Sequence, residues 1–576
     1  MRGLKVKNLT LFGGVCVLAL VAVAGAQDYK SVPPEKAVGG LTTEEKLAEM
    51  ARLHGMVTSE MPEGTLSKRI GVKLSADEIG ELQRVVPRAG EPLKIGLVKP
   101  LPAALSVNGI SPTNKNARAA GGSFANLDDG GFSWAITVGS EGARAIRVHI
   151  RNFSLPENAE MYIFNMKGEV HGPYTDRGPL GTGEFWTNSV RSDTGVIMVR
   201  QVGPTSDLQR AGITFIIDKV GHIGGTPGAD PRNHTWNDPD TCAEFGSNPP
   251  SFAGAECGSV APADQSAIAK MEWVSGCCIF TCTGGLIADT DTGSQRNLFL
   301  TANHCLSRQR LADRLEFWFE YTTDSCQGNC PHDPPDITNG AILLDSSTNG
   351  DHTLLELNSN PPAGSTFLGW NNTPIANANG AALARVSNPN YGSQVFSTDV
   401  VDTSTGTCQG LPRGEFIYSS NTFGGTDGGS SGSPVVNAAG EIVGQLFGAC
   451  GFNVGDPCDD EANATVDGAL AHYFPDVEQY LDPSGGGCTS DAECDDGDAC
   501  NGAETCVGGS CQAGTPPPCQ NGDGCCPDGC DSGNDDDCAA GGCVNPGGLP
   551  PGASCVDDIE CCSDKCKGRS GRKTCK

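Results

Sequence analysis

The chain has 576 residues, enough for about three to five domains at roughly 100–200 residues each. It carries 69 acidic residues against 39 Lys and Arg, a formal net charge of −30, which argues against nucleic-acid binding through a basic face. The 78 Gly and 37 Pro favour short strands and turns over long helices, and a hydrophobic content of 38% excludes a wholly disordered chain.

Residues 1–26 have the form of a secretory signal peptide. A basic start precedes an apolar run at residues 9–24, and the small residues AGA end it before Gln27. An uncleaved membrane anchor is the alternative, but this run is short for a hydrocarbon core of roughly 30 Å. No later segment is long and apolar enough to span a membrane, so the sequence predicts a secreted, extracellular protein with no transmembrane segment.

Two helix signals follow within residues 27–120. Thr42 with Glu45, and Ser75 with Glu78, have the spacing of a capping box, in which hydroxyl and carboxylate satisfy each other's open backbone N–H groups. We therefore predict that residues 27–120 are a helical N-terminal part.

The apolar period changes to two at about residue 121. Ile146, Val148 and Ile150 alternate with polar residues, as in a half-buried strand, and turn signals separate several similar runs. We predict a β-sandwich over residues 121–220 and, because residues 221–240 are dense in Gly, Pro and Asn, a linker there.

The 28 cysteines mark the remaining division of the chain. One is Cys16, eleven lie between Cys242 and Cys458, and sixteen lie between Cys488 and Cys575. This density is typical of disulfide-rich exported proteins. With a Gly-rich break before Cys488, it predicts a central domain at residues 241–483 and an acidic, cysteine-rich tail at residues 488–576.

Three short motifs in the central domain suggest chemistry, beginning with His304. This residue ends an apolar run and precedes Cys305, and Cys282 stands at the edge of another predicted strand. A disulfide between Cys282 and Cys305 would clamp the His304 turn to that strand. Taken alone, a His after a strand is more often structural.

The other two motifs contain Asp351 and Ser431. Asp351 precedes an apolar strand, a commonplace position for a turn Asp. Ser431 lies in the run GGSSGSP, where a tight Gly turn can expose the side-chain oxygen of the serine. In such a turn the neighbouring backbone N–H groups can point toward one position, where an oxyanion could bind. A flexible Ser/Gly linker is the alternative, but two apolar strands follow it directly.

Together the motifs have the order His304, Asp351, Ser431, which is the chymotrypsin order and neither the subtilisin nor the α/β-hydrolase order. Residues 300–305, LTANHC, resemble the LTAAHC block of trypsin-like serine peptidases, and GSSGSP resembles their GDSGGP. The likeness is strongest to secreted bacterial lysyl endopeptidases, which share GSSGSP, DxTLLEL and the GQLxG run. It covers about residues 240–483.

The resemblance implies a mainly β fold with a double six-stranded β-barrel, preceded by a β-sandwich pro-domain and followed by small disulfide-rich modules. His304 would act as general base and then general acid, Asp351 would orient it, and Ser431 would be the nucleophile. The backbone N–H groups of Gly429 and Ser431 would form the oxyanion hole. The resemblance also implies protein or peptide substrates, no required cofactor, and a pro-region that inhibits the enzyme or assists its folding.

Two departures from the family pattern affect activation and specificity. Ser430 replaces the Asp that pairs with the new N-terminus in trypsins, so control should rest on the N-terminal segment until a cut near residues 221–240. A retained binding domain at residues 121–220 is the alternative. Gly425 stands where trypsins place their basic-selective Asp, which leaves selectivity for Lys or Arg open.

Several residues are candidates for the substrate pocket. Thr465 aligns with the Asp of lysyl endopeptidases, and Asp467 shares its strand face two residues later. The other candidates are Gly425, Asp427, Phe447 and Gly448.

In the tail, sixteen cysteines allow eight bridges whose connectivity cannot be read from spacing. Acidic runs at residues 495–498, 521–523 and 534–537 could supply oxygen ligands for Ca²⁺, but none matches an EF-hand, and solvated acidic loops are the favoured explanation. Zinc is less expected, because export favours oxidised cysteines. The competing hypothesis for the whole chain is a secreted binding or adhesive protein that kept the peptidase fold without turnover.

Overall fold

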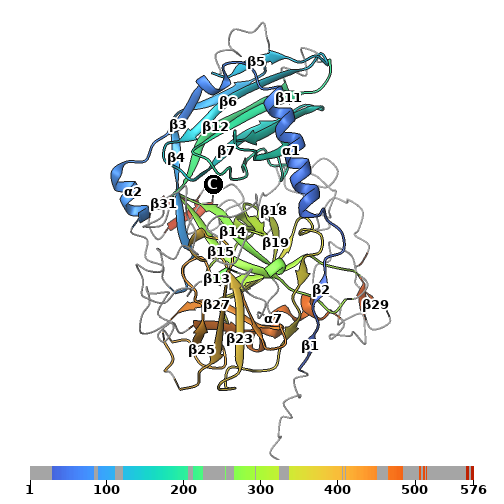
Figure 1. Cartoon of the computed structure of the whole chain (residues 1–576), viewed down its shortest axis with the longest axis vertical. Helices are drawn as coiled ribbons and strands as arrows, with labels where there is room; N and C mark the ends of the chain where they lie inside the picture. Colours follow the sequence, from blue (N-terminus) through green and yellow to red (C-terminus); the bar gives the residue numbers. More distant parts are fainter. Residues whose placement is uncertain are drawn as a thin grey trace, which may run out of the picture.

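The computed structural model describes most of the chain between residues 29 and 483, together with short pieces of the tail (Figure 1). The described ranges are residues 29–83, 89–110, 121–204, 212–224, 253–254, 265–291, 294–322, 336–404, 406–408, 410–449, 465–483, 505–507, 510–512, 514, 566–569 and 572–575. The signal segment, most of the predicted linker, and the three acidic runs of the tail lie outside these ranges.

Two α-helices in the N-terminal part begin as the capping boxes predict. α1 (Thr43–Ser59) starts at Thr42, whose side chain exchanges hydrogen bonds with Glu45. α2 (Ala76–Gln83) starts in the same way at Ser75. One side of α1 packs against a β-sheet through a cluster of apolar side chains, which explains the helical spacing of its apolar residues.

A β-sandwich forms the upper part of the molecule in Figure 1. Its apolar core includes Trp134, Ile136, Ile146, Val148 and Phe215. One sheet contains β3 (Arg69–Val72), β5 (Ser123–Asn126), β6 (Phe132–Ser140), β8 (Ala159–Phe164), β9 (Val170–Tyr174) and β11 (Thr194–Gln201). The other contains β4 (Leu93–Asn108), β7 (Ala145–Ser154), β10 (Phe185–Trp186) and β12 (Thr214–Ile223).

This second sheet differs from the sequence-based expectation in two ways. β4 lies within the stretch expected to be helical, and β12 continues past residue 220 into the range expected to be a linker. In β7 the alternation of Ile146 and Val148 with polar residues predicted one solvated face. Instead Arg147 and His149 are also buried, because that face lies against other parts of the structure.

β4 joins the sandwich to the central domain. It pairs with β12 on one side and with β15 (Cys278–Leu286) on the other, so a single sheet runs through both. Shorter N-terminal contacts extend the connection, since β1 (Ser31–Val32) pairs with β22 (Trp370–Asn371) and β2 (Glu35–Lys36) pairs with β21 (Thr366–Phe367).

The central domain has the predicted double-barrel architecture, seen as a closed six-stranded barrel and a half-barrel. The first half is built from β14 (Ile268–Ser275), β15, β16 (Leu298–Ala302), β17 (Glu316–Phe319), β18 (Asp336–Asn339), β19 (Ala341–Ser347) and β20 (His352–Leu357). The second is built from β22, β23 (Ala382–Ser387), β24 (Val395–Val401), β25 (Phe416–Phe423), β26 (Pro434–Asn437), β27 (Ile442–Ala449) and β28 (Thr465–Ala469), followed by α7 (Leu470–Leu481). The prediction of a mainly β fold is therefore confirmed.

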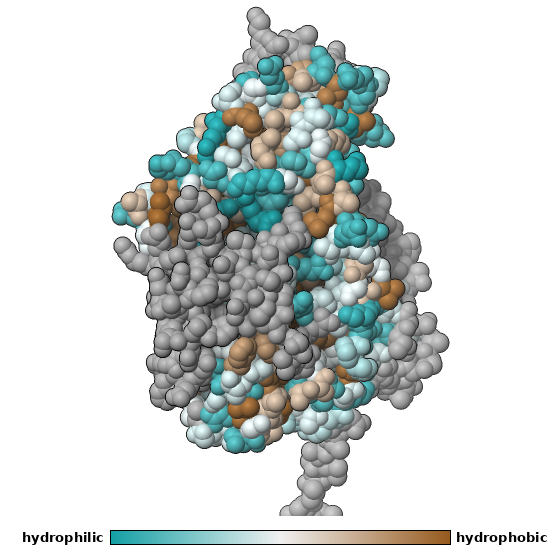
Figure 2. Space-filling view, viewed as in Figure 1, coloured by the Kyte–Doolittle hydropathy of each residue, from teal (hydrophilic) through white to brown (hydrophobic). Residues whose placement is uncertain are grey.

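Short elements complete the described part of the chain. They are η1 (Thr65–Ser67), β13 (Ala253–Gly254), η3 (Gln265–Ala267), α6 (Gln309–Ala312), η4 (Pro389–Tyr391), β29 (Thr505–Val507), β30 (Ser510–Gln512), β31 (Cys566–Arg569) and β32 (Arg572–Cys575). On the face seen in Figure 2, apolar residues are scattered in small groups among hydrophilic ones. No helix in the described ranges has the length and apolar character needed to cross a membrane.

Candidate functional site

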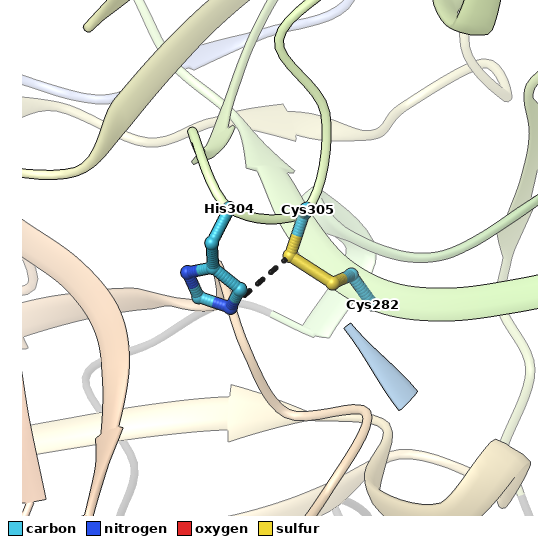
Figure 3. Close-up of side chains that lie close together, drawn as sticks. All are labelled: Cys282, His304 and Cys305. Atoms are coloured by element: carbon cyan, nitrogen blue, oxygen red, sulfur yellow. Dashed lines mark hydrogen bonds between the residues drawn. A yellow bond between two sulfur atoms is a disulfide. The ribbon is translucent and has the colours of Figure 1, made fainter. Parts of the chain in front are cut away.

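His304 lies in a tight turn directly after β16. The backbone N–H of Cys305 donates to the carbonyl of Ala302, and a disulfide joins Cys305 to Cys282 on β15, with Cα atoms 6.2 Å apart (Figure 3). The predicted clamp is therefore present. Because the two sulfur atoms are bonded to each other, neither is a thiolate, and this group of His304, Cys282 and Cys305 is not a metal site.

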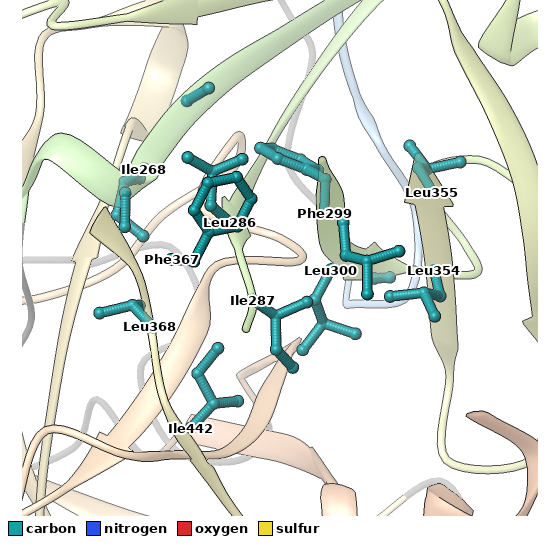
Figure 4. Close-up of a cluster of buried hydrophobic side chains, with 14 of the residues drawn as sticks. Ile268, Leu286, Ile287, Phe299, Leu300, Leu354, Leu355, Phe367, Leu368 and Ile442 are labelled. Atoms are coloured by element: carbon teal, nitrogen blue, oxygen red, sulfur yellow. The ribbon is translucent and has the colours of Figure 1, made fainter. Parts of the chain in front are cut away.

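The two strands beside this turn are anchored in the core of the first barrel. Phe299 and Leu300 of β16 and Leu354 and Leu355 of β20 all belong to one buried apolar cluster (Figure 4). The strands pair in antiparallel register, with Ala302 opposite His352. This packing brings residue 351, which directly precedes β20, next to residue 304.

Asp351 contacts His304 at two points. Its Oδ2 accepts from the ring Nδ1 at 2.6 Å, and its Oδ1 accepts from the His304 backbone N–H at 2.9 Å. Asp351 has a left-handed φ of +53° and is only 5% exposed, so its carboxylate is held in a defined, largely water-excluded position.

Gln445 and Tyr473 support Asp351 from behind. Gln445 Nε2 donates to the carbonyls of Gly350 and Asp351, at 2.8 and 2.9 Å, and the Tyr473 hydroxyl donates to Gln445 Oε1 at 2.5 Å. Sequence reasoning did not single out either residue, although Gln445 belongs to the GQLFG run that carried the family resemblance.

Ser431 lies in the loop between β25 and β26. Its carbonyl accepts from the N–H of Thr283 on β15 at 2.9 Å, and the N–H of Gly432 donates to the carbonyl of Leu446 on β27 at 2.8 Å. A Cβ at Gly432 would lie 2.2 Å from Thr301 Oγ1, and its φ is +82°, so only glycine fits there. The loop is thus fixed between both halves of the central domain.

Two backbone N–H groups of this loop are not engaged. In the described part of the chain, no hydrogen bond uses the N–H of Gly429 or of Ser431. The loop is held through other groups: Thr283 Oγ1 donates to the Gly429 carbonyl at 2.8 Å, and the N–H of Ser430 donates to the Asp427 carbonyl at 2.9 Å. Both free N–H groups remain available to an anionic oxygen.

Ser431 Oγ does not hydrogen-bond to His304 in the described structure. The nearest polar contact recorded for His304 Nε2 is Cys305 Sγ at 3.7 Å. Such catalytic hydrogen bonds are often long or absent without substrate and form in the complex. The structure joins Asp351 to His304 and places the Ser431 carbonyl 3.6 Å from Cys305 Sγ beside them, but it does not close a contact between Ser431 and His304.

Ser430 is buried and hydrogen-bonded without any charged partner. Ser387 Oγ donates to Ser430 Oγ at 3.0 Å, and the Asp427 N–H donates to the same oxygen at 3.3 Å. Ser430 therefore lacks the carboxylate that trypsins have at this position, and a local hydrogen-bond network holds it instead. Asp427 itself is used in the loop, because its Oδ1 accepts from the N–H of Gly428 at 2.7 Å.

Asp467 lies in a fully buried charge cluster beside this loop. Arg385 Nη2 is 2.8 Å from Asp467 Oδ1, and Arg385 Nε is 3.9 Å from Asp399 Oδ2. Burial raises the pKa of Asp467, and it raises the pKa of Asp399 to about 6. Sequence reasoning identified Asp467 but not its two partners, which come from β23 and β24.

The other pocket candidates are on or next to the same strands. Thr465 shares the face of Asp467 on β28 and bonds to Ser419 on β25. Phe447 packs edge-to-face on the His304 ring with centroids 5.7 Å apart, and Gly448 follows it on β27. Gly425 is buried and brings no charge.

Comparison with known proteins connects this site to one family. Residues 255–460 match the model of the lysyl endopeptidase C-terminal domain. The chain is 25% identical over 457 residues to a lysyl endopeptidase of Pseudomonas aeruginosa, a match that covers 75% of this chain and 90% of that relative.

Solved structures show weaker likeness. The active form of the Rv3671c protease from M. tuberculosis aligns with a TM-score of 0.28 at 15% identity, covering 40% of this chain and 87% of that one. The HtrA-type protease AlgW with a tripeptide aligns with a TM-score of 0.27 at 16% identity, covering 38% of this chain and 62% of that one.

Proposed function

We propose that this homologue of the lysyl endopeptidases, a serine peptidase, is a secreted endopeptidase that cuts polypeptides through an acyl-enzyme formed on Ser431. The observation that carries the proposal is the double hydrogen bond of Asp351 to His304, at 2.6 and 2.9 Å. It fixes the ring with Nε2 available as a proton acceptor, because Nδ1 donates to the carboxylate.

The proposed mechanism uses each group in turn. Ser431 Oγ attacks the substrate carbonyl while His304 Nε2 takes its proton, and Asp351 stabilises the imidazolium that forms. The free N–H groups of Gly429 and Ser431 stabilise the oxyanion. His304 then returns the proton to the leaving amine, and a water molecule, activated by the same ring, hydrolyses the acyl-enzyme.

We propose that the pro-region, rather than a new N-terminus, controls activity. Ser430 offers no carboxylate for an N-terminal amine, and its loop is already held by Ser387 and Asp427. Activation would therefore consist of removing the covering N-terminal part after a cut in the predicted linker, beyond the end of β12 at Ile223. Export by the N-terminal signal segment and calcium binding by the acidic tail stay predictions.

We also propose a preference for Lys or Arg before the cut bond. The cluster of Asp399, Asp467 and Arg385 contains two carboxylates and one guanidinium, so it carries an excess negative charge when both acids are ionised. Asp399 Oδ2 and Asp467 Oδ2 are buried without a hydrogen bond, and Asp467 Oδ1 is paired with Arg385 Nη2 at 2.8 Å. A substrate cation would offset the remaining negative charge, since buried carboxylates that share a single guanidinium are incompletely compensated.

The test compares the processed wild-type protein with Ser431→Ala. We expect the wild type to hydrolyse a casein-like protein and to be labelled by an organophosphonate, and the variant to do neither. A processed wild type that neither cleaves nor labels would support the competing function, a secreted binding protein with an inactive peptidase domain.

Peptide mapping of the cuts tests the residue preference. We expect cuts after Lys or Arg, and we expect Asp467→Asn to weaken that preference while Asp427→Asn leaves it in place. Cuts after apolar residues, unaffected by Asp467→Asn, would contradict the proposed preference.

A further inference from the structure

The first described residues of the chain lie along the central domain and not along the sandwich (Figure 1). We call residues 29–38 the N-terminal strap. Within it, β1 pairs with β22 and β2 pairs with β21. The Lys30 N–H donates to Asn372 Oδ1 at 2.6 Å, and the Lys30 carbonyl accepts from the Asn372 N–H at 3.2 Å. The Ala37 N–H donates to the Ser365 carbonyl at 2.8 Å, so the pairing extends along most of the strap.

Val32 of the strap belongs to the apolar core of the central domain. It is 9% exposed and lies in the same cluster as Trp370. At Gly369, an added Cβ would lie 2.1 Å from the Val32 carbonyl oxygen, and its next neighbours would be backbone atoms of Pro33 and Pro34. The φ of Gly369 is not in the left-handed region, so the close approach of the strap is what excludes a side chain there.

The strap also supplies a cation to a buried carboxylate. Asp482, directly after α7, has a side chain that is 1% exposed and is paired with Lys30 Nζ. Its Oδ1 accepts from Thr290 Oγ1 at 2.7 Å. Loss of the strap would take Lys30 away from a carboxylate that stays buried, which is unfavourable. Both the core and the charges of the central domain are therefore completed by the strap.

An exposed stretch connects the strap to α1. Gln295 of the central domain holds the end of the strap, because its Oε1 accepts from the Val38 N–H at 2.6 Å and its Nε2 donates to the Lys36 carbonyl at 2.9 Å. All of residues 38–42 are exposed, and the Val38 side chain is 79% exposed. Beyond this stretch, α1 buries its apolar side against the sandwich. Exposed connections of this kind are preferred sites of proteolytic cutting.

We infer that the strap is a permanent strand of the central domain, and that the chain is cut a second time within residues 38–42. A peptidase hydrolyses one peptide bond of this stretch with one water molecule, which leaves a new carboxylate on the strap and a new amine before α1. The sandwich and α1 then leave together, and the active enzyme is a central chain with the strap bound to it. This inference rests on the proposed peptidase function and its processing, and it adds a bound peptide to the active species.

The bound strap would stabilise the strand that supports the catalytic residues. In the sheet, β1 lies next to β22, and β22 lies next to β27, which contains Gln445. The Ile442 N–H at the start of β27 donates to the Gly369 carbonyl at 2.7 Å, so β27 and the strap contact the same short segment. Removal of the strap would uncover this edge and open the core at Val32.

The experiment uses the full-length protein after its own processing. The active species is isolated by size exclusion without denaturant and is then unfolded, and every chain it contains is weighed by mass spectrometry. We expect a strap peptide in equal amount to the central chain, with its last residue between Val38 and Thr42. We expect no chain that contains the sandwich.

Two synthetic strap peptides test the binding site itself. Each has the sequence of residues 29–38, and one carries Val32→Asp while the other carries Val38→Asp. The same substitution is thus placed at a buried and at an exposed valine. Fluorescence anisotropy measures their binding to the processed Val32→Asp enzyme, which we expect to lose its own strap. The Val32→Asp peptide should bind about a hundredfold or more weakly than the Val38→Asp peptide, because it must bury a charge.

The outcomes separate this inference from the proposed function. An active enzyme that lacks any peptide from residues 27–42 would overturn the inference and leave the peptidase function in place. A retained peptide that continues into α1, or equal affinity of the two synthetic peptides, would overturn it as well. A preparation that keeps the strap but neither hydrolyses casein nor is labelled at Ser431 would instead refute the proposed function alone. If the Val32→Asp enzyme does not fold, the masses of the wild-type chains still decide.

Discussion

Asp351 holds both the ring and the backbone of His304. Its two carboxylate oxygens accept from the ring Nδ1 at 2.6 Å and from the main-chain N–H at 2.9 Å. The orientation of the ring and the position of the turn therefore depend on one side chain. An additional backbone hydrogen bond, from the Asn303 N–H to the Asp351 carbonyl at 2.9 Å, joins the same two turns.

The first prediction concerns Asp351→Asn. An amide keeps the shape but presents an N–H where Nδ1–H needs an acceptor, so the imidazole takes the wrong tautomer. We expect kcat to fall by roughly 10³–10⁴ while KM changes little. Steady-state kinetics on processed protein measures this. An activity within a few-fold of wild type would contradict the role given to Asp351.

The second prediction concerns Gln445 as a positioning residue. Gln445→Leu removes both hydrogen bonds to the carbonyls of residues 350 and 351 and leaves the Tyr473 hydroxyl without its acceptor. We expect kcat to fall by about tenfold with KM unchanged, since each lost buried partner costs on the order of 1–3 kcal/mol.

A matched control for Gln445 is present in the same domain. Gln394 is also fully buried and also donates two hydrogen bonds to backbone carbonyls, those of Gln265 and Ile268. Gln394→Leu should lower thermal stability comparably and leave kcat near the wild-type value. Equal losses of kcat in both variants would show that Gln445 acts only through stability.

The local and catalytic features were predictable because each leaves a signal within a few residues. The capping box at Thr42 and Glu45 depends on a spacing of three, and the His304 turn depends on an apolar strand and a flanking cysteine. The family order of His304, Asp351 and Ser431 then predicted which distant turns would meet.

The partners of buried polar groups were not predictable in this way. Arg147 and His149 alternate with apolar residues as solvent-facing side chains do. They are buried only because distant parts of the chain pack against them in the folded protein. Likewise nothing near Asp467 in the sequence indicates Arg385, because β23 and β28 are far apart along the chain. These contacts depend on tertiary packing, which outweighs local pattern.

The third prediction concerns pH and Asp399. Folding raises the pKa of this carboxyl from 3.8 to about 6 through burial, so the folded state binds the proton more tightly than the unfolded state. Protonated Asp399 therefore contributes to the free energy of unfolding in full below about pH 4. This contribution, on the order of 3 kcal/mol, is lost as pH rises through about 6.

Asp399→Asn tests this pH dependence. Between about pH 4 and 7, we expect the free energy of unfolding of the wild type to fall relative to that of the variant as pH rises. Asp193→Asn is the control, because Asp193 is half-exposed and lies 3.9 Å from its partner Arg69. Parallel pH profiles for wild type and Asp399→Asn would contradict the expected shift.

The fourth prediction concerns the Cys282–Cys305 disulfide. It closes a loop between residues separated by 23 positions, so its loss should cost about 3 kcal/mol by loop entropy. We expect Cys282→Ser with Cys305→Ser to lower the melting temperature and also kcat, because the His304 turn loses its clamp. A variant with unchanged kcat would show that the strand core alone positions His304.

The last prediction concerns how the β-sandwich, which we propose to be a pro-domain, stays on the central domain. Arg147 of β7 is 3% exposed, and its guanidinium lies 3.9 Å from both Glu272 on β14 and Glu316 on β17. Its Nε donates to the Thr187 carbonyl at 3.0 Å. Removing one member of such a buried group leaves the others uncompensated, at a typical cost of about 3–5 kcal/mol.

We therefore expect Arg147→Met to release the pro-region more readily after the linker is cut, with earlier onset of casein hydrolysis. Arg151→Met is the matched control. Arg151 lies on the same strand, but it is 40% exposed and pairs with Asp218 of the β-sandwich itself, not with the central domain. An exposed pair of this kind contributes at most about 1 kcal/mol, so release should stay near the wild-type rate. Dissociation followed by size exclusion and by the lag before hydrolysis distinguishes the two variants. Equal lags would show that pairing of β4 with β15, and not the Arg147 cluster, retains the N-terminal part.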